Sequence, residues 1–149
     1  MRMALFQPDI AGNVGTVIRL AACLGAAVDL IEPMGFAYSD RALARAGMDY
    51  VGRAEVVRHA DWDAFAATLA GRLVLFTTRG DTRHCDARYR ADDILLFGSE
   101  SAGAPAFVHD CADLRLRIPI AADTRSLNLA VAAGIALGEA LRQTKGWPE

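Results

Sequence analysis

Residues 3–24 read MALFQPDIAGNVGTVIRLAACL: a short apolar run, a loop with proline and glycine, and then a longer segment with helical spacing. The run Met3–Phe6 has the length and composition of a buried strand, whereas Val14–Leu24 carries apolar residues at helical intervals. The rest of the chain repeats this alternation of short apolar runs and helical segments. Such a pattern is typical of an α/β domain with a mostly parallel sheet.

The predicted elements form one domain, residues 1–149, with helices on both faces of the sheet, because no linker or internal repeat interrupts the alternation. Several strands are apolar on both faces, as is usual for parallel strands covered by helices. The predicted strands are Met3–Phe6, Val28–Ile31, Glu55–Val57, Leu73–Thr77, Ile94–Phe97 and Leu114–Ile118. The predicted helices are Val14–Leu24, Asp40–Ala46, Asp61–Ala70 and Ser126–Arg142, with a helical turn near Pro105–His109.

The composition excludes several classes of protein. Hydrophobic residues make up 53% of the chain and charged residues 23%, which excludes a disordered tail, a collagen-like rod and a low-complexity linker. The formal net charge is −2, so bulk charge gives no reason to expect a nucleic-acid-binding protein. All basic residues except Lys145 are arginines, which suit phosphates and carboxylates, although a GC-rich genome would give the same bias.

Targeting and metal-binding signals are lacking. The N-terminus does not read as a signal peptide, and the most apolar run, Leu129–Gly138, is far shorter than the roughly 20 residues that cross a bilayer. The three cysteines are widely spaced, and neither they nor the three histidines have metal-ligand spacing. We therefore expect a soluble, cytoplasmic protein with no metal and no membrane partner.

The predicted last helix has little polar surface. Leucines, valine and isoleucine between residues 127 and 141 alternate with alanine and glycine, so the helix is apolar nearly all round. A helix of this kind is buried on more than one side. It lies either in the centre of the fold or against a second copy of the chain, and we favour a homodimer.

The first loop that could carry chemistry is residues 7–19, QPDIAGNVGTVIR, between the first strand and its helix. Backbone amides at the start of that helix could face an anion. The glycine spacing fits neither a P-loop nor the dinucleotide-binding fingerprint. A structural explanation also stays open, in which Asn13 caps the helix and Arg19 pairs on its surface.

The second loop is residues 95–105, LLFGSESAGAP, at the end of a buried strand. Gly98 would let a ligand approach the main chain closely. Ser101 and Gly103 match half of a hydrolase nucleophile elbow, but Ser99 stands where that motif needs glycine. The Glu100 carboxylate at an exposed strand end is the stronger functional candidate.

The third loop is residues 118–129, IPIAADTRSLNL, which leads into the last helix. Ser126 or Asp123 is the candidate N-cap of that helix. A capped helix start accounts for Ser126, but it accounts less well for Asn128, a polar side chain one turn into an apolar helix.

Taken in order, the three loops resemble the motifs of the SpoU/TrmH branch of the SPOUT RNA methyltransferases. The matching positions are Pro8-x-Ile10-x-x-Asn13-x-Gly15-x-x-x-Arg19, then Leu96-Phe97-Gly98-x-Glu100-x-x-Gly103-x-Pro105, then Ile118-Pro119-Ile120 with Ser126-Leu127-Asn128-Leu129. Residues 32–36 and 45–50 are similar to the TrmL subgroup. Ala102 and Ala104 depart from the bulkier or basic residues often found in the second motif.

The resemblance implies a C-terminal trefoil knot, which general topology rules would not predict. It also implies bound S-adenosyl-L-methionine and a homodimer whose active sites lie at the subunit interface. The implied substrate is the anticodon stem-loop of tRNA, methylated on the ribose 2′-oxygen of wobble nucleotide 34 when that is cytidine or a modified uridine.

Site residues follow from the same resemblance. Arg19 is the implied catalytic group, and the residues implied to arrange it are Asn13, Glu100, Ser126 and Asn128. We interpret Arg19 as a stabiliser of the developing oxyanion and a phosphate anchor, since a guanidinium with a pKa above about 12 is a poor base. The positions implied for cofactor binding are Phe76, Thr77, Gly98, Glu100, Gly103, Ile118, Ser126 and Leu127.

RNA contact would need local positive charge. The segment Arg79–Arg90 carries four arginines against two aspartates, and Arg41, Arg45, Arg53 and Arg58 form a second group. Either group could equally be an ordinary solvated face. Two other functions stay open: a non-catalytic nucleotide-binding module that uses the Gly12–Gly15 loop, and a related methyltransferase acting on ribosomal RNA or another tRNA position.

Overall fold

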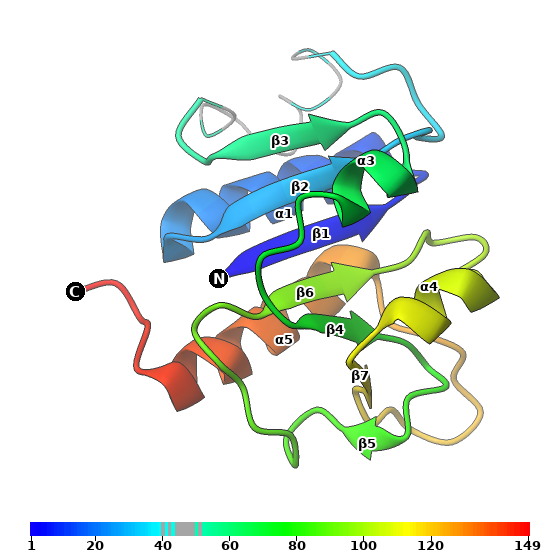
Figure 1. Cartoon of the computed structure of the whole chain (residues 1–149), viewed down its shortest axis with the longest axis vertical. Coiled ribbons are helices and arrows are strands. Elements are labelled where there is room, and N and C mark those ends of the chain that lie inside the picture. Colours follow the sequence, from blue (N-terminus) through cyan, green and yellow to red (C-terminus); the bar gives the residue numbers. More distant parts are fainter. Residues whose placement is uncertain (40, 42, 44–49, 51) are drawn as a thin grey trace.

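A parallel sheet forms the centre of the computed structural model, which describes residues 1–39, 41, 43, 50 and 52–149 (Figure 1). In this part of the chain the sheet has seven strands in the order β3-β2-β1-β6-β4-β7-β5, and every pairing is parallel. This architecture confirms the predicted fold class. The strands are β1 (Arg2–Phe6), β2 (Ala27–Ile31), β3 (Val56–His59), β4 (Leu73–Phe76), β5 (Thr82–Arg83), β6 (Ile94–Phe97) and β7 (Leu114–Arg117).

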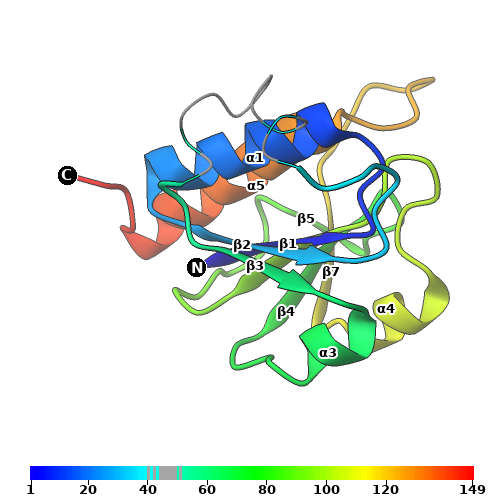
Figure 2. The ribbon, with the colours of Figure 1, turned by 90° about the horizontal axis from the view of Figure 1, so that it is seen from above.

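Helices cover both faces of the sheet (Figure 2). Side chains of β1 alternate between the two cores that result: Met3 and Leu5 join one buried cluster, and Ala4 and Phe6 join the other. The first cluster lies under α1 and α5, and the second contains Phe65 of α3. The described helices are α1 (Ala11–Leu24) and α5 (Leu129–Thr144) on one face, with α3 (Trp62–Ala66) and α4 (Ala106–Cys111) on the other.

A buried carboxylate ties the first three strands together. Asp29 of β2 is 3% exposed and accepts hydrogen bonds from Arg2 of β1 at 2.7 and 3.0 Å. The Nε2 atom of His59, on β3, lies 2.9 Å from the same carboxylate. Because both carboxylate oxygens have partners, this charge is tolerated among apolar side chains.

One predicted strand and one predicted helix have other bounds in the structure, and one short strand was not predicted. The strand predicted at Glu55–Val57 lies at Val56–His59, and the two-residue strand β5 at the sheet edge was not predicted. The helix predicted over Asp61–Ala70 ends at Ala66, where the Thr68 hydroxyl donates to the Phe65 carbonyl at 2.7 Å and competes with the backbone. Most of the helix predicted at 40–46 lies outside the described residues.

The two long helices also begin at other residues than predicted. Helix α1 starts at Ala11 without a side-chain cap, so Asn13 lies inside its first turn and does not cap it. Helix α5 starts at Leu129, and its N-cap is Asn128, not Ser126 or Asp123. The Asn128 side chain accepts hydrogen bonds from the amides of Ala130 and Val131, at 2.9 and 3.3 Å, which explains a polar residue at this place.

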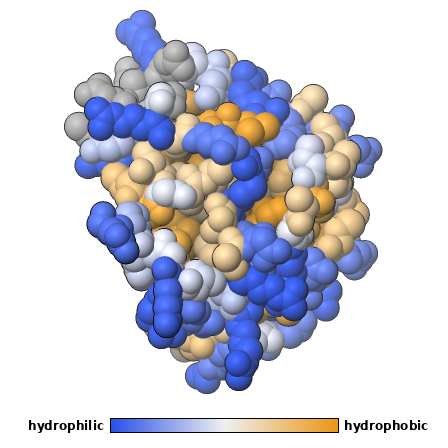
Figure 3. All heavy atoms as spheres, turned by 60° about the vertical axis from the view of Figure 1, so that its left-hand side comes forward, coloured by the Kyte–Doolittle hydropathy of each residue, from blue (hydrophilic) through white to orange (hydrophobic). Residues whose placement is uncertain are grey.

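Helix α5 is buried on one side only. Its buried side packs on α1 and the sheet, whereas Val131 is 51% and Ile135 38% exposed. Exposed apolar surface is not confined to α5, since Val57 of β3 and Phe107 of α4 are also exposed. Figure 3 shows apolar patches among hydrophilic residues on one side of the molecule. No helix in the described part of the chain is long and apolar enough to span a membrane.

The end of α5 is tied to the long connection between β4 and β6. The Gln143 side chain donates to the Ala87 carbonyl at 3.0 Å and accepts from the Tyr89 amide at 3.2 Å. This places the last helix against a segment more than fifty residues earlier in the chain. The trefoil knot implied by the resemblance stays a prediction.

Candidate functional site

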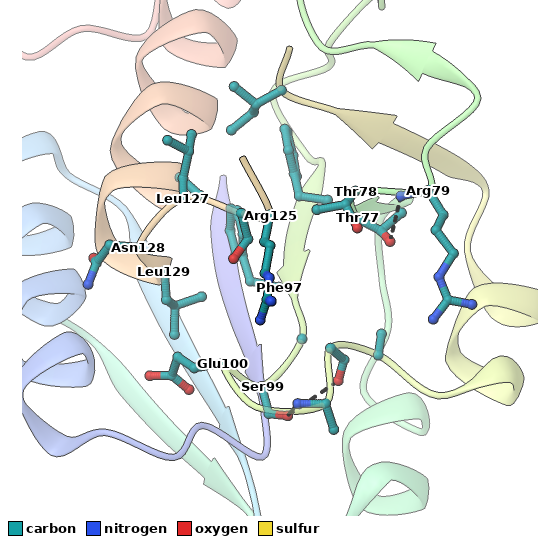
Figure 4. A pocket seen from close by; sticks show the side chains of 18 of the residues that line it. Thr77, Thr78, Arg79, Phe97, Ser99, Glu100, Arg125, Leu127, Asn128 and Leu129 are labelled. Atoms are coloured by element: carbon teal, nitrogen blue, oxygen red, sulfur yellow. Dashed lines mark hydrogen bonds between the residues drawn. The ribbon is translucent and has the colours of Figure 1, made fainter. Parts of the chain in front are cut away.

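A pocket of about 550 Å³ lies at the carboxyl ends of β4, β6 and β7 (Figure 4). Ligands of open α/β sheets bind at this edge. The Phe76 and Phe97 rings are stacked, with centroids 5.1 Å apart, and both line the pocket. Ile118, Leu127 and Leu129 add further apolar surface. The pocket has the size and the apolar character of a small-molecule site.

Most of the residues predicted for the site line this one pocket. All three motif loops contribute: the first through Asn13, the second through Gly98 and Glu100, and the third through Asn128. The sheet brings these loops together because β1 and β4 both pair with β6. The predicted site residues that line the pocket are Asn13, Phe76, Thr77, Gly98, Glu100, Gly103, Ile118, Ser126, Leu127 and Asn128.

Hydrogen bonds connect the three loops directly. The Glu100 carboxylate accepts from the Asp9 amide and from the Asn13 side-chain amide, each at 2.8 Å. The Asn13 side-chain oxygen in turn accepts from the Asn128 side-chain amide at 2.9 Å. Asn13 is therefore the link between the other two loops, and its side chain uses both its donor and its acceptor.

A second contact joins the first and second loops. The Asp9 carboxylate accepts from the Ser101 hydroxyl at 2.6 Å and from the Ser101 amide at 2.9 Å. These hydrogen bonds lower the pKa of Asp9 below its usual value. Within the described residues, no histidine hydrogen-bonds Ser101, so the hydrolase triad that Ser101 would need is not assembled.

The second loop folds back on itself at the pocket. Ser99 and Gly103 exchange backbone hydrogen bonds of 2.9 and 3.2 Å. A Cβ atom on Gly98 would lie 2.3 Å from the Gly103 carbonyl carbon, so only glycine fits there. Gly103 has a positive φ of 69°, which also favours glycine. These two glycines keep the main chain of the loop close to the pocket.

Arg19 does not line the pocket of its own chain. Its exposed side chain lies on α1 with the guanidinium 5.3 Å from the centre of the Tyr50 ring. Arg53 contacts the same ring at 5.6 Å. The structure therefore brings together every other predicted site residue and leaves this predicted catalytic residue at a distance.

The structure also divides the predicted basic groups and adds residues to the site. Of the segment 79–90, Arg79 lines the pocket, whereas Arg88 and Arg90 do not. Arg125, which stands next to Ser126 in the third loop, also lines the pocket and was not predicted as a site residue. Residues 44–49, which include Arg45, lie outside the described part of the chain.

The arrangement suits a nucleoside-like ligand. A flat ring fits the apolar wall, and the glycine-rich loop offers main-chain polar groups at its side. Over residues 1–39, 41, 43, 50 and 52–149, no group of three or more metal-ligating side chains comes together. What the site can do chemically is hold and orient organic groups through its polar network.

Comparison with known proteins gives a consistent result. The model of the SpoU rRNA methylase family matches residues 1–138. The chain is 48% identical over 150 residues to a tRNA (cytidine(34)-2′-O)-methyltransferase of Ancylobacter novellus, covering 99% of this chain and 95% of that relative. It is 42% identical over 151 residues to the protein of the same name of Escherichia coli strain K12, covering 99% and 96%.

Solved structures agree with the sequence matches. One, described as giving structural insights into the 2-OH methylation of C/U34 on tRNA, is similar with a TM-score of 0.91 and 43% identity over 95% of this chain and 94% of that one. A SpoU methyltransferase of Streptomyces viridochromogenes in complex with AdoMet has a TM-score of 0.83 and 27% identity, over 96% of this chain and 57% of that one.

Proposed function

The chain belongs to the SpoU rRNA methylase family, and we propose that it is an S-adenosylmethionine-dependent methyltransferase acting on the ribose 2′-oxygen of wobble nucleotide 34 of tRNA. One observation carries the proposal: relatives that match 99% of the chain at 42% and 48% identity are named for this reaction. Under this proposal, the nucleotides that are methylated are cytidine and carboxymethylaminomethyluridine at position 34 of leucine tRNAs. The part of the tRNA that contacts the protein is the anticodon stem-loop.

The pocket residues fit the cofactor. S-adenosylmethionine supplies an electrophilic methyl group on its sulfonium. The stacked Phe76 and Phe97 side chains and Ile118 offer an apolar slot for its adenine ring. Gly98 and Gly103 hold the second loop where main-chain groups can hydrogen-bond a nucleoside. No metal is needed, because the methyl group is already activated by the positive sulfur.

The remaining task of the protein is to place and activate the ribose hydroxyl. This hydroxyl is a poor nucleophile until its proton is removed or its negative charge is stabilised. Arg19 stabilises that charge and anchors a phosphate, while Asn13, Ser126 and Asn128 arrange the site. Most of the rate gain comes from holding the oxygen in line with the methyl group.

A homodimer reconciles this role with the position of Arg19. Arg19 lies outside the pocket of its own chain, so the Arg19 side chain of each protomer serves the pocket of its partner. The exposed Val131 and Ile135 side chains on α5 provide an apolar surface for the contact, and α1, which carries Arg19, packs beside α5. The active sites then lie between the two protomers.

Nucleoside mass spectrometry tests the proposed function. Purified protein is incubated with S-adenosylmethionine and with tRNA that lacks 2′-O-methylation at position 34. We expect new 2′-O-methylcytidine or 2′-O-methylated modified uridine that maps to nucleotide 34. A methyl group on another tRNA position, or on ribosomal RNA only, would show that the protein catalyses the same methyl transfer on a different nucleotide. Cofactor binding without any methyl transfer would favour a non-catalytic nucleotide-binding module.

A further inference from the structure

Most arginines of this chain are already satisfied by other groups. Six of them form ion pairs with an aspartate or a glutamate, and Arg117 donates hydrogen bonds to the backbone carbonyls of Gly80 and Asp81. The carboxylates offset the charge of the six ion-paired guanidiniums locally, and the two carbonyls occupy hydrogen-bond donors of Arg117. The arginines in ion pairs are Arg2, Arg58, Arg72, Arg83, Arg115 and Arg142.

A smaller set of described arginines makes no side-chain hydrogen bond, ion pair or ring contact: Arg41, Arg79, Arg88, Arg90 and Arg125. Only Arg79 and Arg125 of this set line the pocket. The position of Arg90 is different, because it precedes β6 and so lies at the amino ends of the strands. Two of the five described arginines without a side-chain partner thus lie together at the pocket.

We propose that Arg79 and Arg125 form a phosphate-binding pair at the mouth of the pocket and hold the RNA backbone next to the nucleotide that is methylated. This inference rests on the proposed function. The two residues belong to different loops, one after β4 and the other before α5. In Figure 4 both side chains extend from these loops toward the segment that follows β6.

The charges of the other groups favour a phosphate as the ligand. The Glu100 carboxylate, which also lines the pocket, already accepts hydrogen bonds from Asp9 and Asn13. S-adenosylmethionine carries a net positive charge at neutral pH, so it repels two guanidiniums more than it attracts them. An RNA backbone supplies the missing negative charge, and the guanidinium fork matches phosphate oxygens in geometry.

Single variants test the pair by the salt dependence of binding. For R79Q and R125Q we expect the Kd for tRNA lacking the position-34 methyl group to rise about tenfold each. The slope of log Kd against log salt should become shallower by about 0.7 per lost phosphate contact. The Kd for S-adenosylmethionine, measured by calorimetry without RNA, should stay within about twofold.

The matched control is R90Q, which removes the same charge from an equally unpaired arginine outside the pocket. Its tRNA Kd should stay within about twofold of wild type, and its salt slope should stay the same as that of wild type. Equal effects of R79Q, R125Q and R90Q would overturn the inference, because they would report net charge alone.

Two further outcomes separate this inference from the proposed function. A weaker Kd for S-adenosylmethionine in R79Q or R125Q, with unchanged tRNA binding, would assign the pair to the cofactor carboxylate and overturn the inference. A wild-type protein that methylates tRNA, together with variants that bind tRNA normally, would contradict only the inference. A wild-type protein that binds the cofactor and leaves tRNA unmethylated would contradict the proposed function itself.

Discussion

At the scale of single residues, Asn13 explains why an amide is needed at this position of the first loop. Its side chain donates to the Glu100 carboxylate and accepts from the Asn128 side-chain amide, so it must carry both a donor and an acceptor. An aspartate would have the same shape with no donor. The hydrogen-bond demands of two neighbours therefore select asparagine over its acid.

Replacing Asn13 by aspartate should destabilise the protein in a pH-dependent way. N13D sets a second carboxylate against Glu100, which we expect to cost about 1–2 kcal/mol of unfolding free energy near pH 7.5. As the pH falls toward 5, one proton can be shared between the carboxylates and the loss should shrink. Urea unfolding of N13D and wild type at pH 7.5 and pH 5 measures this loss of unfolding free energy. N13A is the control, because its loss of unfolding free energy should be the same at both pH values. Equal losses for N13D at the two pH values would contradict the argument.

Replacing Arg19 should separate turnover from cofactor binding. R19A is expected to lower kcat at least 100-fold, because it removes the group that stabilises the developing oxygen charge. The Kd for S-adenosylmethionine should change less than about twofold, since the proposed role of Arg19 is toward the ribose oxygen and a phosphate of the RNA and not toward the cofactor. R53A removes the other guanidinium on the Tyr50 ring and reports the cost of that contact alone. Near-native turnover by R19A would refute its role.

At the scale of elements, the start of α5 shows what a sequence pattern could and could not predict. The apolar periodicity predicted a helix in this region, and the structure confirms it. The cap was assigned wrongly to Ser126 or Asp123, because several residues in a row could have capped. Asn128 is the residue that caps the helix, and its side-chain amide also donates a hydrogen bond to Asn13, more than a hundred residues earlier in the chain. Such a contact leaves no local signal.

Two substitutions at Asn128 should divide its roles. N128A loses the cap and the contact to Asn13, so we expect a loss of about 1 kcal/mol and a Tm lower by about 2–4 °C. N128S keeps a good capping group but is too short to reach Asn13. It should have a Tm close to wild type and reduced methyl transfer. Equal Tm values for N128A and N128S would show that capping at this position is unimportant.

The end of α5 carries a pH-dependent contribution to stability. Hydrogen bonds from Arg142 and Gln143 lower the pKa of Glu139 to about 2. Their stabilisation is complete above the unfolded pKa of about 4.3 and is lost as the pH falls toward 2. E139Q should therefore be less stable than wild type at pH 7, by about 1 kcal/mol or less after solvent screening.

Thermal unfolding of E139Q and wild type between pH 7 and pH 3 tests this sign. The difference in Tm should be largest at pH 7 and should narrow below pH 4. R142Q keeps Glu139 but removes its first partner, and its curve should follow that of E139Q. A Tm difference that grows on acidification would contradict the assignment.

At the scale of the whole molecule, the fold was predictable and the assembly of the site was only partly so. Continuous apolar runs such as Leu73–Phe76 and Ile94–Phe97 predicted buried parallel strands, and both are fully buried. The short edge strand β5 escaped prediction because its two residues carry no apolar pattern. Arg19 matched a motif, yet no sequence pattern tells whether a side chain serves its own pocket or that of another copy.

Substitution of the exposed face of α5 should separate the protomers. I135R sets a charge beside Val131 on the apolar surface, and we expect a monomer in place of a dimer by analytical ultracentrifugation at micromolar concentration. Turnover should fall with it. V57R changes an equally exposed apolar residue on β3 and should leave the mass unchanged. A wild-type monomer, or a dimeric I135R, would exclude this face as the interface.

The hydrogen bonds that close the pocket have a consequence for the making of the protein. Asn13 joins residues 87 and 115 positions later in the chain. A ribosome releases the amino-terminal strands long before Asn128 emerges, so a nascent chain folds for most of its synthesis without a complete pocket. A copy that ends before residue 128 lacks the third loop's part of this hydrogen-bond network, so the three loops are joined only when synthesis has nearly finished.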